Sequence, residues 1–302
     1  MKSLKHKLLG FSVPFLAGVC AFLIVLVVFI VIGEIVFGGW STLSWEFLST
    51  GPKEGMTEGG IYPAIIGTFL LVVIMSVAGV PVGTVTAIYL SEYASHRSYL
   101  ARAIRFAVNT LAGVPAIVFG LFGLGFFIQF VGTGMDTFLS GGTDLKWGQP
   151  NILWASLTMA LLTLPVVIVS VEEAIKAVPR ELREASLALG ATKWETIRKV
   201  VLPNSVTGIL TGGILAVSRG AGEVAPILFT GAAYFLPHLP GGLTDQFMEL
   251  GYHVYIMSTQ SPDVEATRGI QYATTLVLLV LTFTLNFSAI FLRYKIRTRT
   301  IR

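Results

Sequence analysis

The sequence predicts an all-α polytopic membrane protein with six transmembrane helices. Apolar residues make up 54% of the 302 residues and charged residues only 13%. The mean hydropathy is +0.76, far from the balance of a soluble globular domain. The apolar residues gather in continuous runs of about 20 residues or more, the length that a helix needs to cross a bilayer. Such runs are too long for the tilted strands of a membrane barrel.

The six runs define the expected spans, and together they make a single transmembrane domain over residues 1–302. The second and fifth runs are longer than a bilayer core requires, so these helices are expected to tilt, kink or project from the membrane. In chain order the expected spans are residues 15–37, 61–90, 108–131, 152–171, 206–235 and 274–292.

The basic residues orient these spans. If the N-terminus is cytoplasmic, the two termini and the cytoplasmic loops hold nearly all of the 21 Lys and Arg residues. Only Lys53, Lys146 and Arg268 then lie on the opposite side, while Arg219 lies inside the fifth span. This asymmetry follows the positive-inside rule and predicts that both termini are cytoplasmic. The basic residues therefore indicate topology, and no nucleic-acid partner is expected.

The loop between the fourth and fifth spans, residues 172–205, carries a helix–glycine–helix pattern. Pro179 can open a helix with an apolar face, and Gly190 follows where a left-handed cap would end it. The stretch TKWE, residues 192–195, is a capping box that starts a second helix, which Pro203 is expected to end. The pattern alone leaves two roles open, an element resting on lipid headgroups or a docking surface for a soluble partner.

The same loop resembles the EAA signature of permease subunits of ATP-binding-cassette importers: E-A-A, three residues, G, nine residues, I-x-L-P. The chain reads Glu184-Ala185-Ser186, then Gly190, then VVLP at residues 200–203, with the spacing intact and two conservative departures, Ser186 and Val200. The resemblance implies a type I importer permease fold whose cytoplasmic coupling helix sits in a cleft of an ATPase subunit. The residues that it places at this contact are Glu184, Ala185, Gly190, Leu202 and Pro203.

Four further stretches are similar to the A-type (PstA) permeases of phosphate importers. The resemblance implies import of inorganic phosphate across the bacterial inner membrane by alternating access. It also implies the partners: a homologous second permease, two ATPase subunits that bind ATP with Mg, and a periplasmic or extracellular phosphate-binding protein. The stretches are PVGTVTAIYLSEYA at 81–94, LAGVPAIVFGLFG at 111–123, AGEVAPILFTGAA at 221–233 and QFMELGYHVYIMSTQSPD at 246–263.

Arg219 and Glu223 interrupt the apolar run of the fifth span and are candidate substrate-path residues. Residues four apart share one face of a helix and can pair, and Gly220 and Gly222 leave room for a neighbour or a solute. Because charge is costly within a bilayer, the pair is expected to face a protein or water-filled interior. An arginine fork matches two oxygens of a phosphate anion. The alternative, an ion pair that only fixes helix packing, stays open.

Several functions lack support in the sequence. No G-x-x-x-x-G-K-[ST] loop occurs, so the chain itself is expected to bind no ATP or other cofactor, and no catalytic residue is expected. The four histidines lack metal-ligand spacing, which predicts no metal site. Two alternatives stay open: an importer permease for another oxyanion such as molybdate or sulfate, and an ion-gradient-driven secondary transporter, which would need more titratable intramembrane groups.

Overall fold

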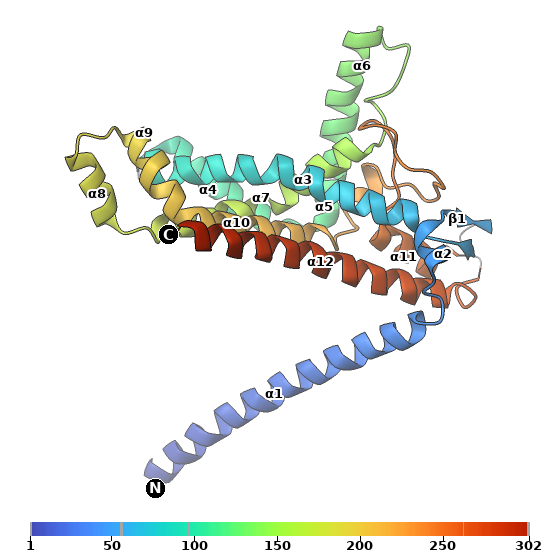
Figure 1. The fold of residues 1–302 in the computed structure, drawn as a ribbon, viewed down its shortest axis with the longest axis horizontal. Helices are drawn as coiled ribbons and strands as arrows, with labels where there is room; N and C mark the ends of the chain where they lie inside the picture. The colour runs from blue at the N-terminus through green and yellow to red at the C-terminus, as the bar shows by residue number, and fades with distance from the viewer. Residues whose placement is uncertain (1, 55–56, 96, 262, 301–302) are drawn as a thin grey trace.

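A computed structural model describes residues 2–54, 57–95, 97–261 and 263–300. The terminal positions 1 and 301–302, which the sequence analysis places in the cytoplasm, lie outside the described residues. Figure 1 shows the arrangement. In chain order the elements are α1 (Lys2–Gly39), α2 (Trp45–Ser49), β1 (Pro52–Lys53), β2 (Glu58–Gly59), α3 (Tyr62–Ile88), the π-helix η2 (Tyr89–Tyr93), α4 (Tyr99–Ala112), α5 (Ala116–Phe122), the π-helix η3 (Gly123–Gly132), α6 (Thr133–Ser140), α7 (Ile152–Lys176), α8 (Arg180–Ala188), α9 (Lys193–Thr196), the π-helix η4 (Ile197–Val201), α10 (Leu202–Gly220), the 3₁₀ turn η5 (Ile227–Phe229), α11 (Leu250–Thr259) and α12 (Arg268–Thr300).

Six helical segments among the described residues are long and apolar enough to cross a membrane, which confirms the predicted number. The bundle runs along the long axis of the molecule, with α8 and α9 at one end and α2, α11 and the β1–β2 hairpin at the other (Figure 1). The start of α1 and the end of α12 both point toward the end that carries α8. The six segments are Val13–Gly39, Tyr62–Tyr93, Ala116–Ser140, Ile152–Lys176, Lys193–Gly220 and Arg268–Ile296.

Helix α7 is the most buried of these segments and packs between α3 and α10. Glycines allow the close approach: a Cβ added at Gly83 of α3 would lie 2.6 Å from Cγ1 of Val167, and one at Gly208 of α10 would overlap the side chain of Ala174. Small residues at helix contacts are the usual basis of packing within a bilayer, where van der Waals contact replaces the hydrophobic effect. The three helices α3, α7 and α10 therefore form the centre of the bundle.

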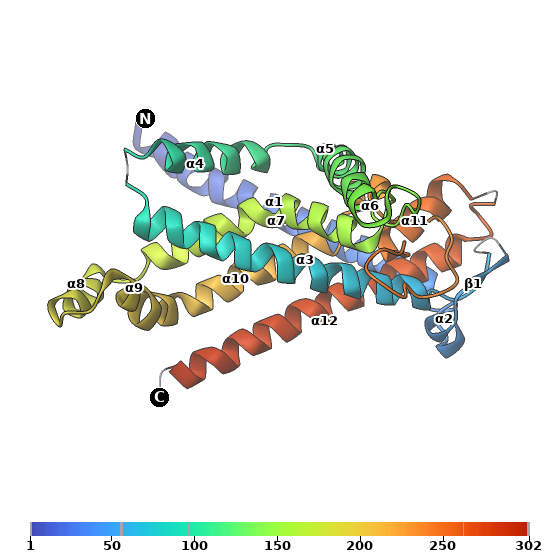
Figure 2. The ribbon, with the colours of Figure 1, turned by 90° about the horizontal axis from the view of Figure 1, so that it is seen from above.

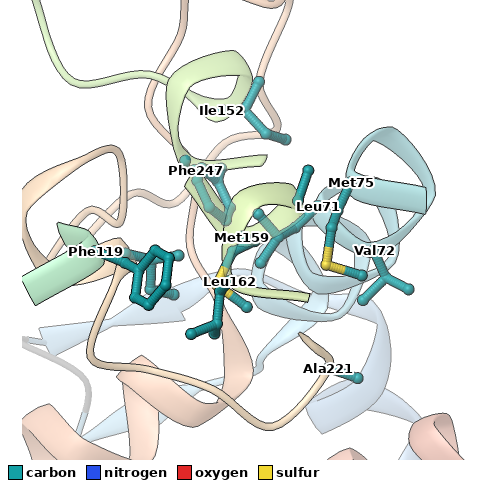
Figure 3. Close-up of a cluster of buried hydrophobic side chains, with 12 residues drawn as sticks. Leu71, Val72, Met75, Phe119, Ile152, Met159, Leu162, Ala221 and Phe247 are labelled. Carbon is teal, nitrogen blue, oxygen red and sulfur yellow. The ribbon is translucent and has the colours of Figure 1, made fainter. Parts of the chain in front are cut away.

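A buried apolar cluster joins the central helices to the segments that follow α10 (Figure 3). Met75 of α3 and Met159 of α7 lie within it, beside Phe119 of α5 and Phe247. Ala221, the first residue after α10, belongs to the same cluster. The backbone at the end of α10 is therefore fixed by the core rather than by lipid.

Helix α1 stands apart from this core. It leaves the bundle at the end near α2 and diverges along its length (Figure 1), and its apolar window is exposed throughout. Its last turn is closely packed, where Gly38 and Gly39 lie against Tyr272 and the backbone of Ala273 in α12. An exposed apolar helix of this length fits a lipid surface.

The predicted third span, 108–131, is wrong in its bounds because the chain forms two helices there. Helix α4 ends before Gly113, and α5 begins after Pro115. A proline disfavours helical conformation at the residue before it, so the helix breaks at Val114. Helix α4 runs beside α7 (Figure 2), with Ala101 and Val108 buried in the cluster that includes residues of α7. The candidate span is instead Ala116–Ser140, whose last helix, α6, projects from the bundle.

The predicted fifth span, 206–235, begins too late. The helix is continuous from Lys193 through η4 and α10, so the prediction that Pro203 ends the second loop helix is wrong. Proline lacks an N–H group and crowds the preceding turn of an α-helix. The wider π-helical turn Ile197–Val201 ends two residues before Pro203, so the turn that the proline crowds is wider than an α-helical one. The side chain of Asn204 donates to the carbonyl oxygen of Val200 at 2.7 Å.

The predicted fifth span also extends too far. Helix α10 ends at Gly220, and the apolar stretch beyond it folds as an irregular segment with the single 3₁₀ turn η5. Ile227 is fully buried there. The backbone of the segment bonds to protein: the Asn151 amide donates to the Thr230 carbonyl at 2.9 Å, and the Ala233 amide donates to the Phe247 carbonyl at 2.8 Å. Hydropathy does not distinguish burial in protein from burial in lipid, which explains the error.

Candidate functional site

The charged pair of the fifth span lies at the end of α10. Arg219 is in the last turn of the helix, and Glu223 lies beyond its end. The two side chains therefore do not share a helical face as expected, but the turn between them still brings Nε of Arg219 to 3.9 Å from Oε1 of Glu223. The arginine side chain is 42% exposed and the glutamate 30%.

The backbone under this pair is fixed while its outer side is open. A Cβ at Gly220 would overlap Sδ of Met75, so α10 lies in close contact with the methionine side chain of α3 here. A Cβ at Gly222 would meet no atom within 4 Å. The hydroxyl of Ser218 donates to Oδ1 of Asn286 at 2.7 Å, which ties this turn of α10 to α12. The pair thus projects from a packed backbone into open space.

The guanidinium of Arg219 has capacity to bind an anion. Its one ion-pair contact, at 3.9 Å, is longer than the 2.7–2.9 Å of a charge-assisted hydrogen bond. Among the described residues it donates no hydrogen bond, so its fork of N–H donors is available for two oxygens of an anion. The two side chains therefore form a loose, partly exposed pair rather than a tightly bonded, desolvated one.

Sequence reasoning missed a buried carboxyl next to this pair. Glu249 precedes α11, is 2% exposed, and accepts from the backbone amides of Gly251 at 2.9 Å and Tyr252 at 2.6 Å. Gly251 in turn lies against Val224, the neighbour of Glu223. Burial raises the pKa of Glu249 to about 7, although the two amide donors oppose the shift. The sequence signal was a glutamate at a helix N-cap before an apolar run, masked by its place in an extramembrane segment.

His253, one helical turn along α11 from Glu249, is also buried. Its side chain is 2% exposed, and its Nδ1 has no hydrogen-bond partner among the described residues. Burial lowers the pKa of His253 to about 4. The histidine is therefore neutral near pH 7 and buried.

The loop after α7 folds through its own caps, largely as the sequence predicts. Pro179 precedes α8, and Gly190 follows it with φ +86°, a left-handed conformation that glycine adopts without strain. The amide of Gly190 donates to the carbonyl of Leu187 at 3.0 Å. The capping box is present: the Glu195 amide donates to the Thr192 hydroxyl at 3.2 Å, and the Thr192 amide donates to the Glu195 carboxylate at 3.0 Å.

Helix α8 presents an unburied surface at the end of the molecule. None of its residues is buried, and Glu184, Ala185 and Gly190 are all exposed. Leu189, the C-cap residue of α8, is 89% exposed. The Ser186 and Thr196 hydroxyls bond at 2.9 Å and hold α8 against α9. The structure therefore exposes an amphipathic helix on a short, capped support.

The remaining predicted contact residues lie close to this surface but far from the charged pair. Leu202 is half-buried and Pro203 exposed at the start of α10. Because a helix rises about 1.5 Å per residue, Arg219 lies roughly 24 Å further along the same helix axis. One continuous helix thus joins the α8–α9 loop to the charged pair.

Two residues that the sequence analysis did not single out attach α8 to the bundle. Nη2 of Arg183 lies 2.9 Å from Oε1 of Glu92 in η2 and donates to the carbonyl of Ile175 at 2.7 Å. The two side chains are 18% and 12% exposed. A partly buried arginine with both a carboxylate and backbone acceptors is a rigid joint between α8 and the ends of α3 and α7.

Comparison with known proteins identifies the family of this chain. The family described as the binding-protein-dependent transport system inner membrane component matches residues 79–302. The chain belongs to this family. It is an ABC transporter permease, a membrane component that is not itself catalytic.

Similar curated proteins are transporter permeases. The probable ABC transporter permease protein YqgI of Bacillus subtilis (strain 168) is 32% identical over 89% of this chain and 90% of its own length. The phosphate transport system permease protein PstA of Yersinia pestis is 41% identical over 61% of this chain and 57% of its own length. PstA 1 of Mycobacterium tuberculosis (strain CDC 1551 / Oshkosh) is 38% identical over 63% and 56%. The match thus spans just over half the length of these PstA relatives.

Solved structures share the fold at low sequence identity. A chain of a bacterial alginate ABC transporter, solved in complex with an alginate pentasaccharide-bound periplasmic protein, aligns with a TM-score of 0.64 and 17% identity over 95% of this chain and 94% of its own. A chain of the MetNI methionine ABC transporter in an inward-facing conformation aligns with a TM-score of 0.55 and 21% identity over 78% and 94%. The fold is therefore that of the type I ABC importer permeases.

Proposed function

We propose that this chain is the permease subunit of an ATP-driven importer that moves inorganic phosphate across the bacterial inner membrane by alternating access. The observation that carries the proposal is the loosely paired guanidinium of Arg219, 3.9 Å from Glu223 and without a hydrogen bond among the described residues. Relatives that are 38% and 41% identical to this chain are phosphate transport system permeases.

The pair suits hydrogen phosphate in particular. Arg219 supplies two donors to two phosphate oxygens. Glu223 holds the guanidinium by charge and accepts a hydrogen bond from the protonated oxygen of the anion. Sulfate, which is fully deprotonated, has no such proton and is repelled by the carboxylate. Affinity should be modest, since a transported ion must also leave.

Helix α8 is proposed as the coupling helix of the EAA signature. It would sit in a cleft of one of two ATPase subunits and contact that subunit through Glu184, Ala185 and Gly190. Leu202 and Pro203 would lie at the base of the loop. The two ATPase subunits would bind ATP with Mg and hydrolyse it. A homologous second permease and an external phosphate-binding protein would complete the transporter. Closure of the ATPase pair would move α8, and the joint at Arg183 would pass that motion to α3 and α7.

The proposed orientation places α8 and both termini in the cytoplasm and residues 141–150 outside. Single-cysteine variants in a Cys20→Ser background test it, since Cys20 is the sole cysteine of the chain. Leu189→Cys and Leu145→Cys both lie at exposed positions. An impermeant thiol reagent applied to intact cells should label position 145 and not position 189. The reverse pattern would overturn the orientation.

Transport with competing anions tests the substrate. The chain is purified from its native membrane with its co-eluting partners, reconstituted into vesicles, and assayed for ATP-dependent uptake of labelled phosphate. Excess unlabelled phosphate should abolish uptake, and excess sulfate or molybdate should leave it nearly unchanged. Stronger inhibition by sulfate or molybdate than by phosphate would favour the alternative, a permease for another oxyanion.

A further inference from the structure

A cavity opens at the α8 end of the bundle, away from the charged pair. Its volume is about 920 Å³, and its walls come from η2, the start of α4, the end of α7, and α8. Figure 2 shows these segments converging at one end of the molecule. In the proposed orientation this end lies at the cytoplasmic leaflet.

The cavity has a surplus of positive charge. Five basic and two acidic side chains line it. Arg105 and Lys176 share the carboxylate of Glu172, at 2.6 and 2.8 Å, and Arg183 pairs with Glu92. These pairs neutralise most of the charge of three cations, so the surplus comes from the remaining two.

Arg102 of α4 and Arg180 of α8 are these remaining cations. Within the described ranges neither has a carboxylate within ion-pair distance. The guanidinium of Arg102 lies 4.5 Å from the ring centroid of Tyr99, which holds it in place. The one other charge on the wall, Glu184, also lacks an ion pair among the described residues and reduces the surplus without removing it. The guanidiniums of Arg102 and Arg180 therefore supply the unneutralised positive charge of the cavity, one from α4 and one from α8.

Helix α4, which forms part of the cavity wall, also carries exposed apolar side chains. Helix α4 buries Ala101 and Val108 against the bundle, while Leu100 and Phe106 point away from it, the latter 73% exposed. Arg102 lies on the same helix between the two faces. A basic pocket between helices next to an apolar surface is the arrangement that binds the headgroup and chains of an anionic phospholipid.

We propose that this cavity binds the phosphate of an anionic phospholipid from the cytoplasmic leaflet. Arg102 and Arg180 ligate the phosphate, and the acyl chains lie along Leu100 and Phe106 of α4. Because Arg180 is in α8 and Arg102 in α4, the bound lipid connects the exposed helix α8 to the bundle. The proposal is independent of the substrate that the permease carries.

The test uses the full chain, purified with its co-eluting partners in mild detergent, and native mass spectrometry with added lipid. Phosphatidylglycerol should bind the unmodified protein more tightly than phosphatidylcholine. The variant Arg102→Gln with Arg180→Gln should bind phosphatidylglycerol about 30-fold more weakly, roughly five-fold for each cation lost. Arg198→Gln is the matched control, because this exposed cation of η4 does not line the cavity. This variant should bind phosphatidylglycerol as tightly as the unmodified protein.

Further arms separate charge, folding and the source of the phosphate. Arg102→Lys with Arg180→Lys keeps both charges and should restore most of the binding, which excludes a folding defect as the cause. Millimolar inorganic phosphate should not displace the lipid, since it lacks the acyl chains that bind α4. Equal phosphatidylglycerol binding by the double glutamine variant and the control would overturn the proposal. So would displacement by inorganic phosphate, or equal binding of phosphatidylcholine.

Discussion

Helix α8 and helix α10 both end at a glycine, for different physical reasons. Gly190 ends α8 with φ +86° in open space, so its role is purely conformational. Gly220 ends α10 with ordinary helical geometry, and a Cβ there would overlap the side chain of Met75 in α3. The first glycine is required by its own backbone conformation, whereas the second lies in close contact with a neighbouring helix.

This difference separates the two candidate sites. The α8–α9 loop keeps its shape through bonds between residues close in sequence, so its surface is present without a partner. The pair at the end of α10 is positioned by α3, α11 and the core that contains Ala221. Changes in the loop should therefore act on docking and leave the rest of the fold intact, whereas changes near Arg219 or Glu249 should depend on the surrounding bundle.

The largest effect is expected at Arg219. Arg219→Gln removes the guanidinium, so phosphate uptake should fall by about 30-fold or more, equivalent to about 2 kcal/mol of lost anion binding. Arg219→Lys keeps the charge without the fork and should also transport poorly.

Glu223→Gln should have a milder effect on phosphate uptake, since an amide still accepts a hydrogen bond, and should relax discrimination against sulfate. Co-elution of the partner chains, unchanged in each variant, controls for assembly.

The double variant Arg219→Met with Glu223→Leu distinguishes an anion site from a packing pair. If the two charges only satisfy each other, removing both leaves no unpaired charge and uptake recovers. An anion site predicts that uptake stays at background. Near-normal phosphate uptake in the double variant would therefore refute the assignment of Arg219 to the substrate path.

The next effect concerns Glu249 and is pH-dependent. Burial raises the pKa of this carboxyl from 4.5 to about 7. Between these values the unfolded chain loses the proton and the folded chain keeps it. The contribution of Glu249 to the free energy of unfolding is therefore complete below pH 4.5 and is lost as the pH rises through 7, a change of about 3 kcal/mol. Thermal unfolding in detergent should show that Glu249→Gln loses less stability than the unmodified protein between about pH 5 and about pH 8.

His253 also makes stability pH-dependent, and comparing Glu249→Gln with the unmodified protein cancels its contribution. Its pKa is lowered from 6.5 to about 4, so its stabilisation is present above pH 6.5 and is lost as the pH falls through 4. Because both proteins retain His253, the difference between them at each pH reports Glu249. Parallel pH profiles would contradict the raised pKa.

A smaller effect is expected at the glycine joint. Gly190→Leu requires a left-handed conformation that costs a leucine about 1–2 kcal/mol, although the position has ample space. The chain should insert at normal abundance, and phosphate uptake should fall by about 5- to 30-fold as α8 is misplaced. Gly190→Asn is the matched control, since asparagine tolerates this conformation, and should retain most uptake. Equal uptake by the leucine and asparagine variants would exclude a role of the φ angle.

The smallest effect is expected at the capping box. Thr192→Ala removes the hydroxyl that accepts from the Glu195 amide, which should cost about 1 kcal/mol of local stability. Faster amide hydrogen exchange should be confined to residues near α9. Thr192→Ser keeps the hydroxyl and should match the unmodified protein. Exchange that also increases in α10 near Arg219 would show that the loop is not an independent local unit.

The sequence by itself determined the membrane class, the number of spans, and the α8–α9 loop. Apolar runs report burial directly, and Pro179, Gly190 and the TKWE box act within one or two turns of their own position. It also identified Arg219 and Glu223 as charges in an apolar run, while the role proposed for them still depends on the experiments above.

Only the tertiary structure decided where α10 ends, how the chain passes Pro203, and which polar groups surround the pair. The segment after Gly220 is as apolar as a membrane span, but it is buried against α5, α7 and Phe247. In the sequence, Glu249 and His253 look like ordinary extramembrane residues, but both are buried in the folded protein. The physical reason is that hydropathy and capping are local properties, whereas the choice between protein and lipid as the burying environment depends on residues distant in the chain.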